Sequence, residues 1–121
     1  MTYYTGRFTP SITGNQTISI GFQPTWLELT VSQKYGITDS TLHKSEGSTD
    51  GTNQNYTTIY SSGSASKTIE GSGKLLLHYE NISGVWTEVL NTTFVAFTTT
   101  GFTINNIAGT TNYKVRVKCG N

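Results

Sequence analysis

The stretch GNQTISIGFQPTWLELTVS, residues 14–32, decides the fold class. Apolar residues alternate with small or polar ones through it, at Ile18, Ile20, Phe22, Leu27, Leu29 and Val31. A period of two indicates strands with one buried face. Pro24 lacks a backbone N–H and ends the first strand. We therefore expect two neighbouring antiparallel strands over 17–22 and 27–31.

A second stretch, TTTGFTINN at residues 98–106, leads to the closing NYKVRVKC at 112–119. Further alternating segments occur at 3–8, 55–60, 65–69, 75–79, 85–90 and 94–99. Gly-rich and Ser-rich turns separate them, one of which makes 55–69 a hairpin, and no segment has a helical period. The pattern predicts an all-β fold, an antiparallel β-sandwich or jelly-roll of about eight to ten short strands, in a single domain over 1–121.

The composition is polar without being charged. There are 23 Thr, 12 Ser and 9 Asn, against 8 Lys+Arg and 7 Asp+Glu. Thr is β-branched and suits a pleated surface, whereas helices in water use Glu, Lys, Ala and Leu. The 14 aromatic residues supply a core that disordered chains lack. We expect an ordered chain whose strands have hydroxyl-rich outer faces.

The net charge is +1, with no run of like charges. Lys114, Arg116 and Lys118 alternate with apolar residues, so they mark the solvent face of one strand rather than a nucleic-acid footprint. No apolar stretch is long enough to span a bilayer, and the first residues lack the pattern of a signal peptide. We expect no nucleic-acid binding and no membrane insertion.

Residues 33–54 read as a long polar loop, the first place to look for a binding surface. It contains oxygen ligands of the kind that Ca²⁺ prefers, at Asp39, Glu46, Asp50 and Asn53. Their spacing matches no EF-hand, so a solvated loop is the favoured interpretation and we expect no metal.

No constellation of catalytic residues is visible. The seven carboxylates are scattered, His43 and His78 are isolated, and there is neither a nucleophile elbow nor a phosphate loop. Cys119 is the single cysteine, which excludes an intrachain disulfide and favours a core position at the end of the last strand. We expect a protein that is not an enzyme, with no catalytic residue and no cofactor.

Aromatic residues are the candidates for a binding surface. Glycans are held by aromatic faces and by short polar side chains, both of which are plentiful here. The candidates for contact with a ligand or partner are Trp26, Tyr35, Tyr56, Tyr60 and Trp86. Subunit contacts use the same residue types, so an oligomer interface is the alternative.

The stretch at residues 14–32 and the stretch at 98–119, which we name the two framing stretches, resemble small β-sandwich modules of tailed-bacteriophage virion proteins. The polar segment SEGSTDGTNQ between them, residues 45–54, is part of this resemblance. A looser resemblance connects them with H-type lectins, trimeric sandwiches that bind N-acetylgalactosamine-like sugars. The resemblance covers about half of the chain. The residues that carry it and mark the fold are Gly21, Phe22, Pro24, Gly101 and Phe102.

The resemblance implies a structural protein of a phage virion, assembled in the host cytoplasm. A short chain that enters a strand almost at once is similar to capsid decoration (cement) proteins, which implies a homo-oligomer, preferably a trimer, bound to the major capsid protein or another virion protein. The alternative is a tail-fibre-type receptor-binding adhesin or carbohydrate-binding lectin with a cell-surface glycan as partner. A tail-associated adaptor is a third role within the virion.

Overall fold

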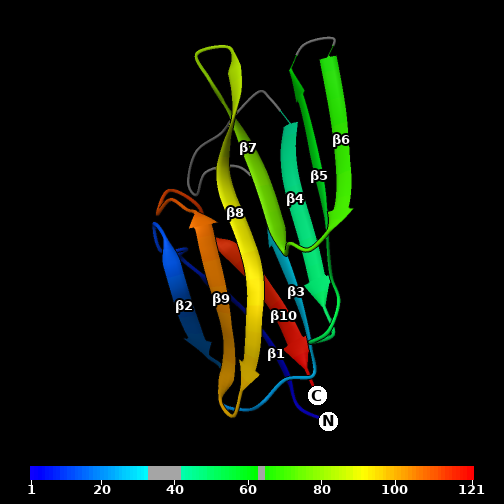
Figure 1. The fold of residues 1–121 in the computed structure, drawn as a ribbon, viewed down its shortest axis with the longest axis vertical. Coiled ribbons are helices and arrows are strands. Elements are labelled where there is room, and N and C mark those ends of the chain that lie inside the picture. The colour runs from blue at the N-terminus through cyan, green and yellow to red at the C-terminus, as the bar shows by residue number, and fades with distance from the viewer. Residues whose placement is uncertain (33–41, 63–64) are drawn as a thin grey trace.

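The computed structural model describes residues 1–32, 42–62 and 65–121, and these form two antiparallel sheets without a helix (Figure 1). The strands are β1 (Tyr3–Phe8), β2 (Gly14–Ser19), β3 (Trp26–Val31), β4 (Leu42–Thr49), β5 (Gln54–Ser62), β6 (Ala65–Ser72), β7 (Leu76–Ile82), β8 (Val85–Thr98), β9 (Gly101–Ala108) and β10 (Val115–Gly120). The predicted all-β sandwich is confirmed.

The strand order is β1-β10-β3-β4-β5-β6 in the six-stranded sheet and β2-β9-β8-β7 in the four-stranded sheet. The two chain ends lie together at one end of the sandwich, because β1 pairs with β10 (Figure 1). The sheets lie face to face, and their inner faces share one apolar core.

The expected antiparallel pair of 17–22 with 27–31 is wrong. β2 pairs with β9 in one sheet, while β3 pairs with β10 and β4 in the other. The connection crosses between the sheets: Gly21 has a φ of +92°, which favours glycine, and Pro24 is buried in the turn. Alternation had located both strands, but it carries no information on which sheet each strand joins.

The two Gly-Phe steps of the framing stretches meet in space. The N–H groups of Ile20 and Gly21 both donate to the carbonyl of Thr100, at 2.7 and 3.0 Å. A Cβ on Gly101 would overlap the carbonyl oxygen of Ile18, so the close pairing of β2 with β9 requires glycine there. Phe102 is fully buried. The two segments therefore form one structural unit, although about eighty residues separate them.

The expected polar loop over 33–54 is wrong for residues 42–49, which form β4 in the interior of the six-stranded sheet. His43, Ser45 and Thr49 point inward and are buried, while Lys44, Glu46 and Ser48 are exposed. Because these inward positions hold no aliphatic side chain, the sequence of β4 shows no alternation of apolar and polar residues. Residues 33–41, including Asp39, lie outside the described residues.

Two other strand predictions have mixed outcomes. The hairpin of 55–60 with 65–69 is confirmed by β5 and β6. The segments 85–90 and 94–99, expected as two strands, form the single strand β8. Its register with β9 shifts twice, after Asn91 and after Phe94, close to the residues that join the two expected segments.

Two groups of buried residues differ in chemistry, and we name them the apolar half and the polar half of the interior. The apolar half comprises Leu27, Leu29, Phe102, Ile104, Val115, Val117 and Cys119, which the two sheets cover from both sides. Cys119 takes the expected core position, and burial raises the pKa of its thiol to about 11. The polar half comprises His43, Ser45, Thr58 and His78, which lie where β7 meets β4 and β5.

The expected strand at 75–79 corresponds to β7, and residues 75–78 are all buried. It is nevertheless an edge strand, and β4 and β5 of the facing sheet cover its edge. The hydroxyls of Ser45 and Thr58 approach the carbonyl of Leu77, and Gly47 leaves room for the carbonyl of Leu75. Polar and small residues of the facing sheet thus take the place of a neighbouring strand.

Candidate functional site: an aromatic surface and two outer faces

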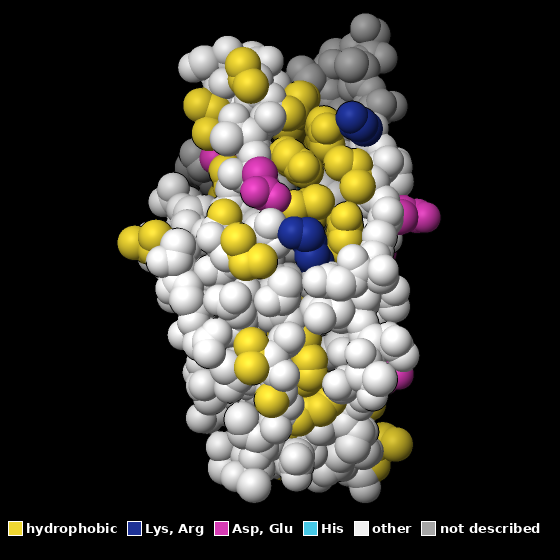
Figure 2. Space-filling view, viewed as in Figure 1, with side chains coloured by type: hydrophobic (Ala, Val, Ile, Leu, Met, Phe, Trp, Pro, Cys, Tyr) yellow, Lys and Arg dark blue, Asp and Glu magenta, His cyan; other side chains and the backbone are white. Residues whose placement is uncertain are grey.

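Four half-buried aromatic rings form a surface beside the edge of β7, which we name the aromatic surface: Tyr56, Tyr60, Tyr79 and Trp86. The six-stranded sheet is wider than the four-stranded sheet, so the inner side of β5 and β6 extends past β7. Figure 2 shows hydrophobic side chains gathered in the upper part of the molecule, between β7 and the β5–β6 hairpin.

Three rings of the aromatic surface, those of Tyr60, Tyr79 and Trp86, form a contacting group. The Tyr60 centroid lies 4.6 Å from that of Trp86 and 5.2 Å from that of Tyr79, both with tilted planes. Tyr56 lies across Gly71 of β6, where a Cβ would be 2.7 Å from the Tyr56 hydroxyl oxygen. Burial, with further contributions from Glu88 and the other two tyrosines, raises the pKa of Tyr79. The Tyr79 hydroxyl is therefore a neutral donor at neutral pH.

The five aromatic residues predicted from the sequence have different positions. Tyr56, Tyr60 and Trp86 come together, as a shared binding surface requires. Trp26 lies elsewhere, against Tyr3 and Gly120 near the chain ends. Tyr35 is outside the described residues. Tyr79 was missed, because its place after the leucines of 75–77 indicated a core strand.

A pair of buried histidines lies beneath this surface. His78 is 0 % exposed, its Nε2 lies 2.8 Å from the Ser32 carbonyl oxygen, and its Nδ1 lies 2.7 Å from Ser45 Oγ. The rings of His43 and His78 stack with centroids 5.0 Å apart. Burial, then the neighbouring His43, lowers the pKa of His78 to about 3. His78 is therefore neutral in the fold at neutral pH.

One set of tautomers satisfies these partners. His78 Nε2–H donates to Ser32 O, the Ser45 hydroxyl donates to His78 Nδ1, and the Thr58 hydroxyl donates to Leu77 O. His43 Nδ1–H then donates to the carbonyl of Tyr79 at 3.1 Å. Although a serine beside a histidine can act as a nucleophile, Ser45 and His78 are both fully buried, so a substrate cannot reach them. Their arrangement supports a structural role.

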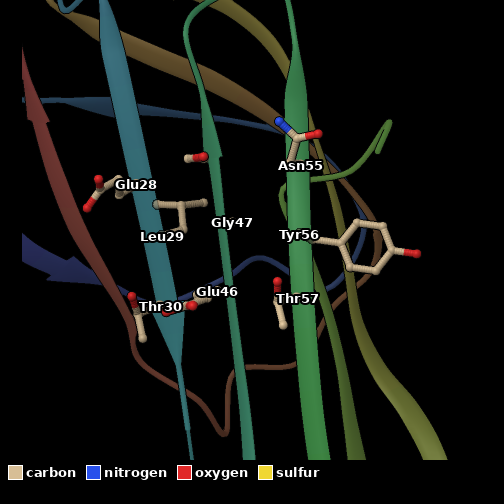
Figure 3. A pocket seen from close by; sticks show the side chains of 9 residues that line it. Glu28, Leu29, Thr30, Glu46, Gly47, Asn55, Tyr56 and Thr57 are labelled. Atoms are coloured by element: carbon tan, nitrogen blue, oxygen red, sulfur yellow. The ribbon is translucent and has the colours of Figure 1, made fainter. Parts of the chain in front are cut away.

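The outer face of the six-stranded sheet carries charges and a shallow hollow of about 290 Å³ (Figure 3). Glu28 and Thr30 come from β3, Glu46 from β4, and Asn55 and Thr57 from β5. In Figure 3 the Tyr56 ring extends away from β4. Since Glu28 and Glu46 border the hollow, it favours groups that donate hydrogen bonds.

The described residues that were considered as calcium ligands, Glu46, Asp50 and Asn53, do not belong to one loop. Glu46 is in β4, and Asp50 Oδ1 accepts hydrogen bonds from the N–H groups of Thr52 and Asn53 in a tight turn. Those hydrogen bonds lower the pKa of Asp50. Among residues 1–32, 42–62 and 65–121, no group of three or more His, Cys, Asp or Glu side chains is placed to hold a metal ion.

The part of the outer face of the four-stranded sheet that β2, β9 and residues 93–98 of β8 form differs sharply, and we name this part the uncharged face; Lys74 and Glu88, which bond to Asn91, lie beyond it. Its outward residues, on β2, β9 and residues 93–98 of β8, are Asn15, Thr17, Ser19, Thr93, Val95, Ala96, Thr103, Asn105 and Ile107. The Thr17 and Thr103 hydroxyls share a hydrogen bond of 2.9 Å, and Val95 and Ile107 are 47 % and 54 % exposed. In Figure 2 the lower part of the molecule shows mainly white and yellow side chains, while charged side chains appear near the middle, in the upper half and at the edges.

Comparison of the chain with family models, with curated proteins and with solved structures gives no match. The described residues also contain no helix with the length and apolar character needed to cross a membrane.

Proposed function

We propose that this protein is a non-enzymatic structural protein of a tailed-phage virion that binds the outside of the capsid as a decoration protein. The resemblance of the two framing stretches supports the virion assignment, and those stretches form one unit through β2 and β9. The observation that carries the proposal is the uncharged face, which β2 and β9 largely form.

The uncharged face suits permanent contact with another protein. Burying it removes no charge from water, and charged side chains are depleted at the centres of protein interfaces. Its Thr and Asn side chains are short, so ordering them costs less conformational entropy than ordering Lys, Arg, Glu or Gln. Val95 and Ile107 add apolar area. Each copy makes a modest contact with the capsid, and a homotrimer that makes three such contacts at once binds the capsid more tightly than one copy does.

Co-sedimentation with capsids that lack the protein tests this function. We expect the purified protein to sediment with the particles and to raise the temperature at which they release their genome. The Thr103→Lys variant places a charge on the uncharged face and should lose at least about tenfold in binding. Thr68→Lys introduces the same charge on exposed β6 and should bind like the original protein. Binding that is absent, or equal for both variants, would contradict the proposal.

A glycan-binding adhesin or lectin is the second candidate, and the aromatic surface favours it. Tyr60, Tyr79 and Trp86 present apolar ring faces together with two hydroxyls and an indole N–H, which is the combination that sugars use. A glycan array on the purified protein separates the two functions. Sugar binding that Trp86→Ala abolishes, without sedimentation on capsids, would replace the decoration role with the adhesin role.

A further inference from the structure

Three cationic side chains line a small pocket on the outer face of the six-stranded sheet. Lys44, Lys114 and Arg116 surround about 210 Å³, together with Thr30, Val31 and Ser32. The three cations come from different parts of the chain: Lys44 from β4, and Lys114 and Arg116 from the end of the chain, at and before β10. We name this the cationic pocket. It lies on the opposite side of the sandwich from the uncharged face.

The strand register concentrates further charge beside the cationic pocket. Arg116 pairs with Thr30 on one side and lies directly opposite Arg7 of β1 on the other. Four of the chain's eight Lys and Arg residues, Arg7, Lys44, Lys114 and Arg116, therefore share this corner. In a protein of net charge +1, that is a strong local imbalance.

This arrangement has an energetic cost. Like charges directly opposite on neighbouring strands destabilise a sheet. The Lys114 amine donates to Thr9 Oγ1, which orients it at the pocket. Glu46 is the nearest acidic residue by register, opposite Thr30, and Glu28 lies opposite Lys118. Lys44, Lys114 and Arg116 all line the pocket, so an anion is the ligand that its lining favours.

The surroundings define the chemical class of that anion. Thr30 borders both the cationic pocket and the hollow of Figure 3, so the two form a continuous polar track. Beyond Thr30 the track offers Ser48, Asn55 and Thr57, with the carboxylates Glu28 and Glu46. Hydroxyl, amide and carboxylate groups bind sugar hydroxyls. The same carboxylates repel a nucleic-acid backbone, which needs cations along its whole path.

We propose that the cationic pocket binds the phosphate or sulfate substituent of a glycan whose neighbouring sugars lie along the polar track. Lys and Arg form short, charge-assisted hydrogen bonds with such oxyanions, and the Thr30 and Ser32 hydroxyls add neutral donors. This binding site is independent of the uncharged face and of the capsid-decoration function.

A titration with defined ligands tests the proposal. The probes are sodium sulfate, a disaccharide carrying one sulfate, its unsulfated parent and a twelve-nucleotide single-stranded DNA, each followed by amide NMR shifts. We expect the sulfated disaccharide to bind at least about tenfold more tightly than its parent, with shifts at Thr30, Ser32 and Lys44, and to weaken as salt rises.

Two variants that each remove one positive charge provide the matched control. Arg116→Gln should weaken binding of the sulfated disaccharide at least about fivefold, and Lys67→Gln, on exposed β6, should leave it unchanged. A thermal melt shows that both variants are folded. Equal affinity for the sulfated and unsulfated disaccharides, equal losses in both variants, or tighter binding of the DNA would each overturn the proposal.

Discussion

The two halves of the interior are packed by different means. In the apolar half, Leu29, Phe102 and Val117 lie between two sheet faces, so side chain meets side chain. In the polar half, the edge of β7 lies against β4 and β5, so backbone carbonyls meet the facing sheet. A carbonyl in the interior needs a donor. Serine, threonine, histidine and glycine therefore occupy positions where a sandwich would otherwise hold aliphatic residues.

The largest effect is expected for Gly47→Val, which fills the closest backbone approach in the polar half. A Cβ at this position would overlap the Leu75 carbonyl oxygen and lie 2.9 Å from the Asn55 carbonyl oxygen. We expect the free energy of unfolding to fall by at least about 4 kcal/mol, measured by urea denaturation. Ser48→Val, the next residue but exposed, should change it by less than about 0.5 kcal/mol. Similar values for both would show that β7 does not lie on β4.

One substitution in each half of the interior compares how much the two kinds of packing contribute to the free energy of unfolding. Leu29→Ala removes a fully buried side chain from the apolar half and should cost about 3 kcal/mol of unfolding free energy. Ser45→Ala leaves His78 Nδ1 without its hydroxyl donor and should cost about 1–2 kcal/mol. Urea denaturation measures both. If Ser45→Ala were neutral, the polar half would not depend on these hydrogen bonds.

A smaller effect, confined to acid pH, is expected from His78. Its pKa is about 3 in the fold and ordinarily 6.5, so the unfolded chain takes up the proton first as the pH falls. Its contribution is complete above pH 6.5 and is lost progressively toward pH 3. Between pH 7 and pH 5 the unfolding free energy should fall by about 2 kcal/mol more in the original protein than in His78→Gln. Parallel pH curves for the two proteins would contradict the buried neutral histidine.

A separate prediction, which concerns reactivity and not stability, tests the closed packing of the apolar half through Cys119. The thiol is buried and its pKa is raised to about 11, so little of it is ionised at pH 8. Iodoacetamide should modify the folded protein at least about a hundredfold more slowly than the urea-unfolded protein, as followed by mass spectrometry. Rapid modification of the folded protein would mean that water enters this half.

Sequence patterns located the strands of the apolar half and, of the strands that enclose the polar half, β5 and β7 but not β4. Alternating Ile, Leu and Val located β2 and β3, and the turn-flanked segments located the β5–β6 hairpin. β4 was missed because its inward residues pack against the edge of β7 and are polar or small, so β4 lacks the alternation of apolar residues that marks a strand. The sheet to which each strand belongs depends on long-range pairing, which alternation does not encode.

The sequence identified individual residues of the candidate binding surfaces, but not which residues from different strands lie together. Tyr60 and Trp86 were identified as possible contact residues, but their meeting with Tyr79 depends on how β5, β7 and β8 lie together. Similarly, the alternation of Lys114 and Arg116 indicated a solvent face. That Arg7 and Lys44 join them follows from the strand order, because β1, β10, β3 and β4 are neighbours that the sequence separates widely.

Hydroxyl-radical footprinting of the protein on capsids tests the decoration function most directly. Val95 and Ile107 are exposed on the uncharged face, and Ile59, 37 % exposed on the other sheet, is an internal control. We predict that oxidation of Val95 and Ile107 falls at least about threefold on the particle, because burial in an interface excludes the radical and its water, while oxidation of Ile59 is unchanged. Protection of Ile59 with Val95 and Ile107 still accessible, or protection of none of them, would contradict the account.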